Sequence, residues 1–580
     1  MDREEKVNRK NRVDKTMKLR KKSIVYFLIF LIFSLYFTYT MVSTGKLVVQ
    51  NDGVFHLQRL QQIFNNVKQG QIFTFIASDT FRHIGLGSFL FYPYVWYFPF
   101  ILFKLFFSSI TAIYLGYGFF LLLTFLCSYY AMKIYSNNVD RSFLFSLIYT
   151  LCSKHIIEIA RFQWGELFAY TFIPIAFAGF YKLVYENTDK SKTSYTLAIG
   201  LALILYAHLL SAYLVVLLIG FVFLVSVFLR RVSIKVWIDL FKNIGVFLLL
   251  TSWVLVPLFT DYLGHNIEPA KPGFNYPDTF ETLWFSSLKN EIYVDTSIGI
   301  ILIIVFIIGW VFIKNNKSEL IIYLLGYLLI IGSTSLLPWH SLGKYSIFGM
   351  FSVLQYSFRL LILAVPLLSI SVSYIICQFM KKVPKNTLGH SLMIIFTVIL
   401  IISGVQLTNE FKNQQQVTIP KLTKNTNDLN TTASEQFVLT NTNYNALTNY
   451  RAPIGGEDYS IRGLNIKRME NNEGYLNGRK RKFIPINSAN QLVYNVTIKK
   501  ENSELELPII PYKHTKVKIN NTNVKFKVSK EKGILLNKLQ KGKNRIEVSY
   551  KPSIMFYILF WVATITYIVL FSLFIKNKFE

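Results

Sequence analysis

The first long apolar run of the chain reads SIVYFLIFLIFSLYFTYTMV and extends from Ser23 to Val42. About twenty apolar residues in a helix are enough to span the hydrocarbon core of a bilayer. The run is longer than the core of a signal peptide, and it lacks a small-x-small cleavage site. It therefore predicts a retained membrane anchor, with the basic tail 1–22 in the cytoplasm.

Composition extends this interpretation to the whole chain. Of the 580 residues, 52% are hydrophobic and 16% are charged, whereas soluble domains have about 25% charged residues. Apolar runs recur with basic residues between them, which predicts a polytopic α-helical membrane protein. The net charge of +30 lies largely in the tail, in short loops and in one late polar region. We therefore expect membrane lipids or a cell-wall polymer as partners, and no nucleic acid.

Hydropathy predicts about twelve transmembrane helices in the cytoplasmic membrane. If the basic loops 230–235, 314–317 and 381–385 are cytoplasmic, parity places both the N- and C-termini in the cytoplasm. This parity holds only if the apolar stretch 89–107, which is interrupted by prolines, does not cross. The predicted spans are 23–42, 111–133, 142–154, 166–185, 194–210, 211–229, 238–258, 298–314, 319–337, 360–379, 390–408 and 553–575.

The chain then divides into four parts. A tail (1–22) precedes a transmembrane module (23–408) with an external loop (43–110), and an extracytoplasmic region (409–552) precedes the last helix and a short cytoplasmic tail (553–580). From Gln491 onward, apolar and polar residues alternate between turn signals, which predicts a β-sandwich-like domain. The asparagine-rich stretch 409–430 predicts a flexible linker. The basic strand faces either contact an anionic wall polymer or are solvated, and both interpretations stay open.

A polar motif, Asn51-Asp52-Gly53-x-x-His56-x-x-Arg59, begins the external loop. Positions i, i+4 and i+7 share one face of a helix, so Asp52, His56 and Arg59 are predicted to point the same way. Such a triplet can accept a proton and hold a phosphate at the membrane surface. The alternative is structural, with Asn51 or Asp52 as a helix N-cap and Arg59 against lipid headgroups. Parity supports a polar cavity, because it also places most histidines at the outer face: 56, 83, 155, 208, 265 and 340.

Further motifs follow in a characteristic order, which is Gly85 to Pro93, Tyr149 to His155, Arg161 to Pro174, Tyr206 to His208 and Gln355 to Arg359. In this order, over roughly residues 20–380, the chain resembles the bacterial multi-pass proteins labelled 6-pyruvoyl-tetrahydropterin synthase-related. These proteins are in turn similar to the YfhO-type and other GT-C glycosyltransferases. Nothing in the sequence indicates a pterin enzyme. The closing strands of the late region also resemble the external domain of YfhO-type proteins.

The resemblance implies a GT-C fold and transfer of a sugar from a polyprenyl-phosphate carrier at the outer face of the membrane. It matches Asp52 to the acidic residue of the first external loop and Glu166 to a second acidic site. After the arginine, this chain has Phe-Gln-Trp-Gly-Glu where the family has Gly-Ala-x-x-Glu, so the conformation of that loop is open. The donor would be a polyprenyl-phosphate-linked sugar, and the acceptor a cell-wall polymer or a glycolipid.

Roles follow from the residue types. We expect Asp52 to be the general base, with Glu166 and His56 as further catalytic residues. The expected phosphate- and substrate-binding residues are Arg59, Arg161, His208, Arg359 and His265, because guanidinium groups pair bidentately with phosphate oxygens. Glu166 would pair with Arg161 or help to hold a metal. No diagnostic metal motif is present, and a divalent ion would use Asp52, His56 and Glu166.

Structural alternatives exist for two of these residues, since Arg359 also fits a membrane anchor and His208 fits a hydrogen-bonded helix turn. At the level of the whole chain, two rival functions remain. A transporter or flippase of lipid-linked saccharide would use the same cavity without chemistry, and it would tend to show inverted repeats. A non-catalytic subunit for envelope assembly would depend on the late β region and not on Asp52.

Overall fold

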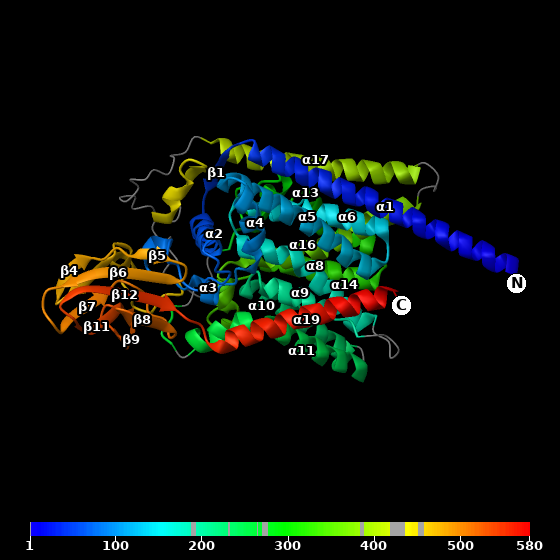
Figure 1. Ribbon diagram of the computed structural model, residues 1–580. Coiled ribbons are helices and arrows are strands. Elements are labelled where there is room, and N and C mark those ends of the chain that lie inside the picture. Colours follow the sequence, from blue (N-terminus) through cyan, green and yellow to red (C-terminus); the bar gives the residue numbers. More distant parts are fainter. Residues whose placement is uncertain are drawn as a thin grey trace.

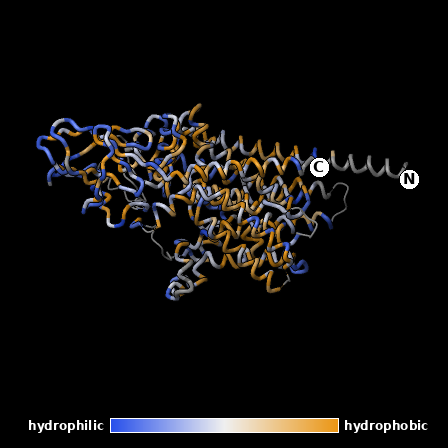
Figure 2. The backbone as a smooth tube through the Cα atoms, turned by 60° about the horizontal axis from the view of Figure 1, so that its bottom comes forward, coloured by the Kyte–Doolittle hydropathy of each residue, from blue (hydrophilic) through white to orange (hydrophobic). Residues whose placement is uncertain are grey.

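The computed structural model describes residues 2–186, 193–229, 232–263, 265–268, 277–382, 388–417, 436–449 and 458–579. The chain is mostly helical, with a helix bundle and a C-terminal strand-rich region at one end of it (Figure 1). Hydrophobic residues dominate the bundle, whereas hydrophilic residues are concentrated in the strand-rich region (Figure 2).

Eight helices in the described ranges are long and apolar enough to cross a membrane. Each coincides with one of the twelve predicted spans, so the chain has the helices of a polytopic membrane protein. They are Leu19–Val42 of α1 (Asp2–Val42), α5 (Ser109–Ser136), α8 (Trp164–Tyr185), α10 (Leu209–Leu229), α11 (Ile234–Pro257) continued by η3 (Leu258–Tyr262), η5 (Ser357–Leu360) continued by α16 (Leu361–Lys382), Ser391–Gln416 of α17 (Leu388–Gln416), and Ile554–Lys576 of α19 (Ile554–Phe579).

The other four predicted spans coincide with helices that are bent or short. The segment 142–154 forms α6 (Val139–Thr150) and α7 (Ser153–Ala160), which meet at an angle of 43° and together could supply a ninth span. The segments 194–210, 298–314 and 319–337 form α9 (Thr196–Leu205), α13 (Ile300–Ile313) and α14 (Lys317–Gly332). The stretch 89–107 forms only α3 (Ser88–Phe91), η2 (Val95–Tyr97) and α4 (Phe98–Phe106), because its prolines interrupt helical hydrogen bonding.

The most deeply buried spans are α8 and α16, whereas few residues of α19 are buried. Glycines bring neighbouring helices close: Gly179 of α8 lies against the main chain of Leu197, and Gly200 of α9 lies against that of Ala176. Close packing of small residues is what holds membrane helices together, because lipid tails are as apolar as the side chains. These contacts hold α8 and α9 close together.

Basic segments meet at the end of the bundle where α1 begins. Lys22 forms an ion pair of 2.9 Å with Asp140, and Arg141 forms one of 2.8 Å with Glu319. These contacts join α1, α6 and α14. The start of α1 and the end of α19 both lie at this end, opposite the strand-rich region (Figure 1). Of the basic loops used for parity, residues 230–231 and 383–385 lie outside the described residues.

The strand-rich region contains two five-stranded sheets, with strand orders β10-β11-β7-β3-β4 and β5-β6-β12-β8-β9. Apolar residues from both sheets, such as Leu505 and Ile546, share one core, as expected for sheets that pack face to face. The strands are β3 (Glu473–Leu476), β4 (Arg479–Lys482), β5 (Ile486–Ser488), β6 (Gln491–Ile498), β7 (Ser503–Leu507), β8 (Thr515–Ile519), β9 (Thr522–Val524), β10 (Lys527–Val528), β11 (Ile534–Leu539) and β12 (Gly542–Tyr550).

The start of the predicted region 409–552 differs from the expectation. Residues 409–416 continue α17, and residues 418–430 of the predicted linker lie outside the described residues. β2 (Phe437–Thr440) pairs with β1 (Lys46–Val49) of the helical part and not with the two sheets. The backbone groups of β1 need hydrogen-bond partners, and β2 supplies them. The Gln415 side chain of α17 also accepts a hydrogen bond from Val48 N at 2.7 Å.

Candidate functional site

Asp52 occupies the N-cap position of α2 (Gly53–Lys68), but its side chain makes no capping hydrogen bond. Within the described part of the chain, its carboxylate has neither a hydrogen-bond donor nor an ion-pair partner. The residue is exposed, yet burial raises its pKa to about 6. We interpret this combination as a side chain on the wall of a narrow recess.

Four charged groups act on the Asp52 carboxyl. Arg359 opposes the rise of the Asp52 pKa, Glu166 and Asp295 reinforce it, and Arg161 opposes it. Arg359 Nε lies 2.7 Å from Glu166 Oε1, and Arg161 Nε lies 2.7 Å from Asp295 Oδ1. Glu166 therefore pairs with Arg359, in place of the pairing with Arg161 considered from sequence. Each arginine is held by a carboxylate of its own.

The local backbone fixes the position of the Arg161 side chain. It ends α7, and the next residue, Phe162, has a left-handed conformation (φ 58°) that turns the chain into α8. Gln163 Nε2 donates to Asp295 Oδ1 at 2.8 Å, and Arg161 Nη1 donates to the carbonyl of Tyr293 at 2.9 Å. The turn between α7 and α8 and the loop before α13 thus fix the guanidinium from two sides.

Arg359 is held by its own segment. Its Nη1 donates to the carbonyl of Leu354 at 3.0 Å and to Gln355 Oε1 at 2.9 Å. Gln355 has a positive φ of 60°, which is uncommon for a residue with a side chain and costs free energy that the surrounding contacts must offset. The second oxygen of Glu166, Oε2, is buried with no hydrogen-bond partner in the part of the chain that is described.

A third ion pair lies near Asp295. Lys154 Nζ and Glu158 Oε1 are 2.7 Å apart, and both side chains are fully buried. Lys154 also reaches the carbonyl of Asp295, at 3.5 Å. Asp295 and Glu158 were not predicted as site residues. An ionisable pair at i, i+4 inside an apolar run is a sequence signal for Glu158, because charges there are costly. Asp295 carries no comparable signal, since it lies in an ordinary polar loop.

His56 and Arg59 share one face of α2, as expected, but both turn toward an aromatic cluster. His56 Nδ1 lies 2.5 Å from the Tyr97 hydroxyl, and its ring stacks on Trp164. Burial lowers the pKa of His56. Arg59 is fully buried and donates to the Tyr97 hydroxyl at 3.1 Å and to the carbonyl of Tyr92 at 2.6 Å. The hydrogen bonds of Arg59 therefore hold the 92–97 segment against α2.

Tyr92 links α2 to the α8 side of the site. Its ring packs on that of His208, with 5.5 Å between centroids. His208 Nδ1 in turn lies 2.9 Å from the Ser211 hydroxyl. Gly165 permits this arrangement, because a Cβ at that position would overlap the Tyr92 hydroxyl and come within 3.0 Å of the His208 ring. Tyr92 and Gly165 belong to the motifs that carry the family resemblance, but the sequence does not indicate their contact.

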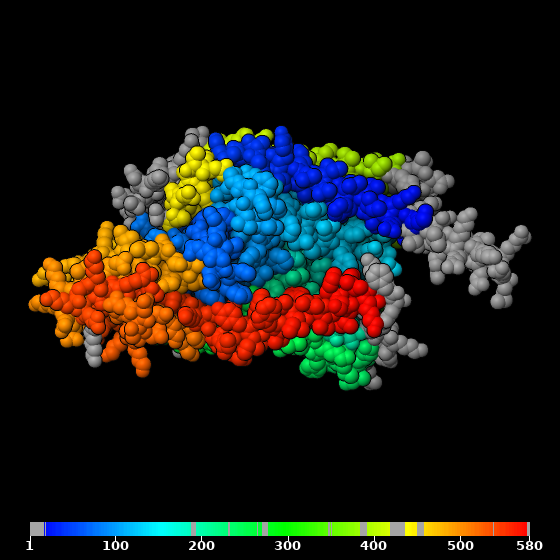
Figure 3. Space-filling model, viewed as in Figure 1, coloured from blue at the N-terminus to red at the C-terminus, as the bar shows by residue number. Residues whose placement is uncertain are grey.

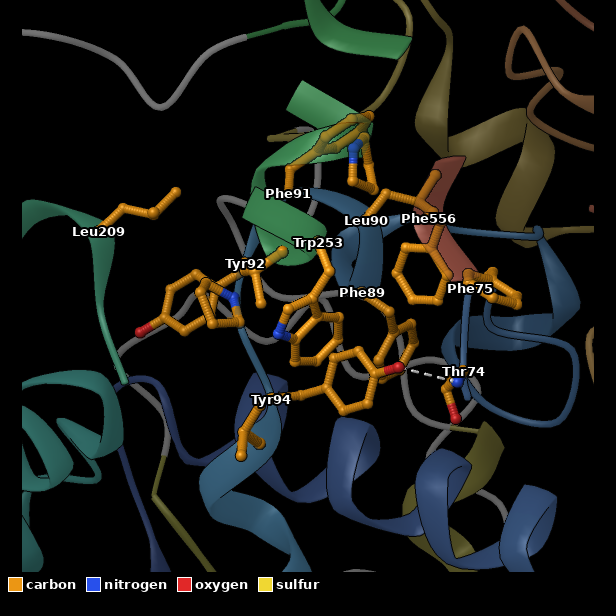
Figure 4. A pocket seen from close by; sticks show the side chains of 14 residues that line it. Thr74, Phe75, Phe89, Leu90, Phe91, Tyr92, Tyr94, Leu209, Trp253 and Phe556 are labelled. Atoms are coloured by element: carbon orange, nitrogen blue, oxygen red, sulfur yellow. Dashed lines mark hydrogen bonds between the residues drawn. The ribbon is translucent and has the colours of Figure 1, made fainter. Parts of the chain in front are cut away.

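An apolar groove borders the same segment (Figure 4). It has about 440 Å³ of empty space, including its open mouth. Tyr92 belongs to its wall, so the residue that packs on His208 and accepts a hydrogen bond from Arg59 also borders the groove. The groove lies between the 89–95 segment, α11 and the start of α19, and its lining is Thr74, Phe75, Phe89, Leu90, Phe91, Tyr92, Pro93, Tyr94, Val95, Leu209, Trp253, Val254, Pro257 and Phe556.

Two expectations find no counterpart in this arrangement. His265 is exposed, and its ring contacts the carbonyl of Leu263 and no residue of the charged cluster. In the described ranges, no group of three His, Cys, Asp or Glu side chains is arranged to hold a metal ion, and this includes the set Asp52, His56 and Glu166.

Comparison of the chain with protein-family models, curated proteins and solved structures gives no match. Function must therefore be argued from the residues.

Proposed function

We propose that the chain is a membrane glycosyltransferase of the GT-C class, which transfers a sugar from a polyprenyl phosphate to an envelope glycopolymer or glycolipid. The observation that supports this most is an unpaired carboxyl, Asp52, with a pKa raised to about 6 and two arginines acting on it. A base with a pKa near the working pH is the most effective proton acceptor. Arg161 and Arg359 supply the positive charge that a departing phosphate requires.

The proposed step is a displacement at the anomeric carbon. Asp52 takes the proton of an acceptor hydroxyl, and the acceptor oxygen forms a bond to the anomeric carbon of the sugar. The bond from that carbon to the phosphate oxygen breaks, and the electron pair leaves with the phosphate. Arg161 and Arg359 stabilise the phosphate, while Asp295 and Glu166 hold the two guanidinium groups in position. The lipid tail would lie in the apolar groove beside Tyr92.

The proposal includes a topology with twelve spans and an extracytoplasmic strand-rich region. It is supported by the gathering of Lys22, Arg141 and their ion-pair partners at one end of the bundle. The strand-rich region lies at the other end (Figure 1). Basic residues are enriched in cytoplasmic loops, so the end with the basic clusters is assigned to the cytoplasm. Asp52, Arg161 and Arg359 then face outward.

The test is the substitution Asp52→Asn in the full chain, reconstituted with a labelled polyprenyl-phosphate sugar and an acceptor membrane fraction. We expect transfer to fall by at least about 100-fold, the lower end of what a general base contributes. Asp79→Asn is the matched control, because Asp79 lies in the same external loop and its carboxylate contacts Gln62. Wild-type transfer by the Asp52 variant would overturn the proposal.

A flippase of lipid-linked saccharide is the second candidate. The bend between α6 and α7 and the buried Lys154–Glu158 pair favour it, because broken spans with ionisable groups are typical of transporters. The same reconstituted vesicles separate the two functions. A flippase moves the labelled lipid across the bilayer with no change in its chemistry, whereas a transferase releases polyprenyl phosphate and labels the acceptor.

A further inference from the structure

Strand β4 carries four consecutive basic residues, Arg479, Lys480, Arg481 and Lys482, and all four are exposed. We call this set the basic edge. β4 is the last strand of its sheet, so one side of its backbone has no strand partner among the described residues. A tight turn joins it to β3: Asn477 and Gly478 both have positive φ, 49° and 75°, as a two-residue hairpin turn requires. The basic edge is therefore part of a rigid hairpin.

Most of this charge is not neutralised by the protein itself. Lys480 Nζ lies 2.7 Å from Glu473 Oε2 of β3. For the other three cations, no ion pair is formed within the part of the chain that is described. Neighbouring like charges repel, so the hairpin presents an arrangement that a bound anion would stabilise. Phe483, which is buried, anchors the end of the strand against Gly474.

The position of the basic edge favours a polymer over a membrane. β4 lies at the end of the strand-rich region that is farthest from the helix bundle, and the bundle is the part that carries the apolar helices (Figures 1 and 3). Lipid headgroups would surround the bundle, whereas the basic edge lies at the opposite end of the strand-rich region. Alternate residues of a strand lie about 7 Å apart on one face, which presents a regular row of charge to an extended chain.

We propose that the basic edge binds a linear anionic polymer with phosphate groups in its backbone. Arginine supports the choice of phosphate, because guanidinium pairs bidentately with phosphate oxygens. The inference rests on the proposed function in one respect, since such a polymer would be the sugar acceptor. Exposed lysines on an edge strand also prevent sheet-to-sheet aggregation, and the experiment must separate that role from binding.

The test measures binding of long-chain inorganic polyphosphate to the full chain in neutral detergent, at several salt concentrations. The variant replaces Arg479, Lys480, Arg481 and Lys482 with Gln. We expect at least a tenfold loss of affinity, and a salt dependence that weakens by about three in the log–log slope, because each contact with a single-stranded polyanion contributes about 0.7. The control replaces Lys516, Lys525, Lys527 and Lys530, which are also exposed, with Gln. It makes the same change in net charge, and we expect it to bind as the wild type does.

Equal losses in the two variants would show that only net charge matters, and no loss in either would show that β4 takes no part; each result overturns the proposal. Stronger binding to phosphatidylglycerol vesicles than to polyphosphate overturns it in favour of a membrane surface. A variant with Lys in place of both Arg479 and Arg481 keeps the charge and the protected edge, so partial loss there supports phosphate pairing. Asp52→Asn should bind polyphosphate normally, so failure of docking and failure of transfer are distinguishable.

Discussion

At the residue scale, Asp52 illustrates how the site differs from its sequence motif. The spacing of Asp52, His56 and Arg59 predicts one shared face, and His56 and Arg59 both contact the Tyr97 hydroxyl. The motif does not indicate which members are satisfied internally. Arg59 donates to the Tyr97 hydroxyl and to the carbonyl of Tyr92, whereas the Asp52 carboxylate has no partner in the described residues. Only the folded 92–97 segment makes this distinction, so the sequence alone could not.

The raised pKa of Asp52 gives a pH prediction. If Asp52 is the base, only its ionised form is active, so transfer should rise about tenfold per pH unit below a pKa of about 6 and level off above it. Initial rates between about pH 4.5 and about pH 8.5 test this. Asp79→Asn should retain the same profile. A rate that does not change through pH 6 would show that another group accepts the proton.

Stability should respond in the opposite direction. The folded-state pKa of about 6 lies above the ordinary value of 3.8, so the folded protein binds this proton more tightly than the unfolded chain does. The resulting stability is present below about pH 4 and is lost as the pH rises through 6. Asp52→Asn should therefore raise the unfolding temperature at neutral pH and change it little at pH 4, as measured by thermal unfolding in detergent. An unfolding temperature below that of the wild type at neutral pH would indicate a structural role for Asp52.

At the element scale, the site depends on how the start of α8 meets the 92–97 segment and the loop before α13. From the lengths of the apolar runs and the positions of the basic loops, the sequence predicts that Arg161, Glu166 and Arg359 lie at one level of the bundle. Hydropathy and parity do not predict which side chains of different helices are neighbours at that level. The pairing of Glu166 with Arg359, and of Arg161 with Asp295, arises from the turn at Phe162 and from the packing of α8 on α16.

Gly165 tests this packing. In Gly165→Ala, the added methyl group would overlap the Tyr92 hydroxyl, so Tyr92 and the start of α8 must shift. We expect transfer to fall about 100-fold, because a displacement of about 1 Å at a reacting group costs that much. Gly220→Ala is the matched control, since nothing lies within 4 Å of its added Cβ. Combining Gly165→Ala with Tyr92→Phe removes the overlapping oxygen, so the double variant should regain activity. Wild-type activity of Gly165→Ala would contradict the arrangement.

At the scale of the whole molecule, the division into an apolar bundle and a strand-rich region is predictable from sequence. Long apolar runs mark the helices, and period-two alternation marks the strands. The junction between the bundle and the strand-rich region is not predictable. β2 joins the helical part, since its partner β1 lies almost 400 residues earlier in the chain, and no local pattern records such a pairing. The same is true of the polar contacts that attach one of the two sheets to the end of α11.

Asp261 is the centre of that attachment. It lies in η3, at the end of α11, with a fully buried side chain. Its carboxylate accepts hydrogen bonds from His514 Nδ1 at 2.9 Å and from the Tyr550 hydroxyl at 3.0 Å. His514 precedes β8 and Tyr550 ends β12, so one carboxylate joins the end of a span to one of the two sheets. α11 and α19 also form walls of the apolar groove, which couples the position of the strand-rich region to the mouth of that groove.

Asp261→Ala should loosen this attachment. It leaves the buried Tyr550 hydroxyl and the partly exposed His514 ring without this acceptor, at a cost of about 1–3 kcal/mol for the buried donor. We expect a lower unfolding temperature and faster proteolytic cleavage near residues 551–553, between β12 and α19, as seen on denaturing gels.

Asp261→Asn keeps one acceptor oxygen, so its unfolding temperature and cleavage rate should lie between those of Asp261→Ala and the wild type. Glu281→Ala, at an exposed position in α12 (Phe280–Leu288), should behave as the wild type. Unchanged cleavage in Asp261→Ala would mean that other contacts, such as those of Asn490 with Phe75 N and the Phe73 carbonyl, are sufficient to hold the two parts together.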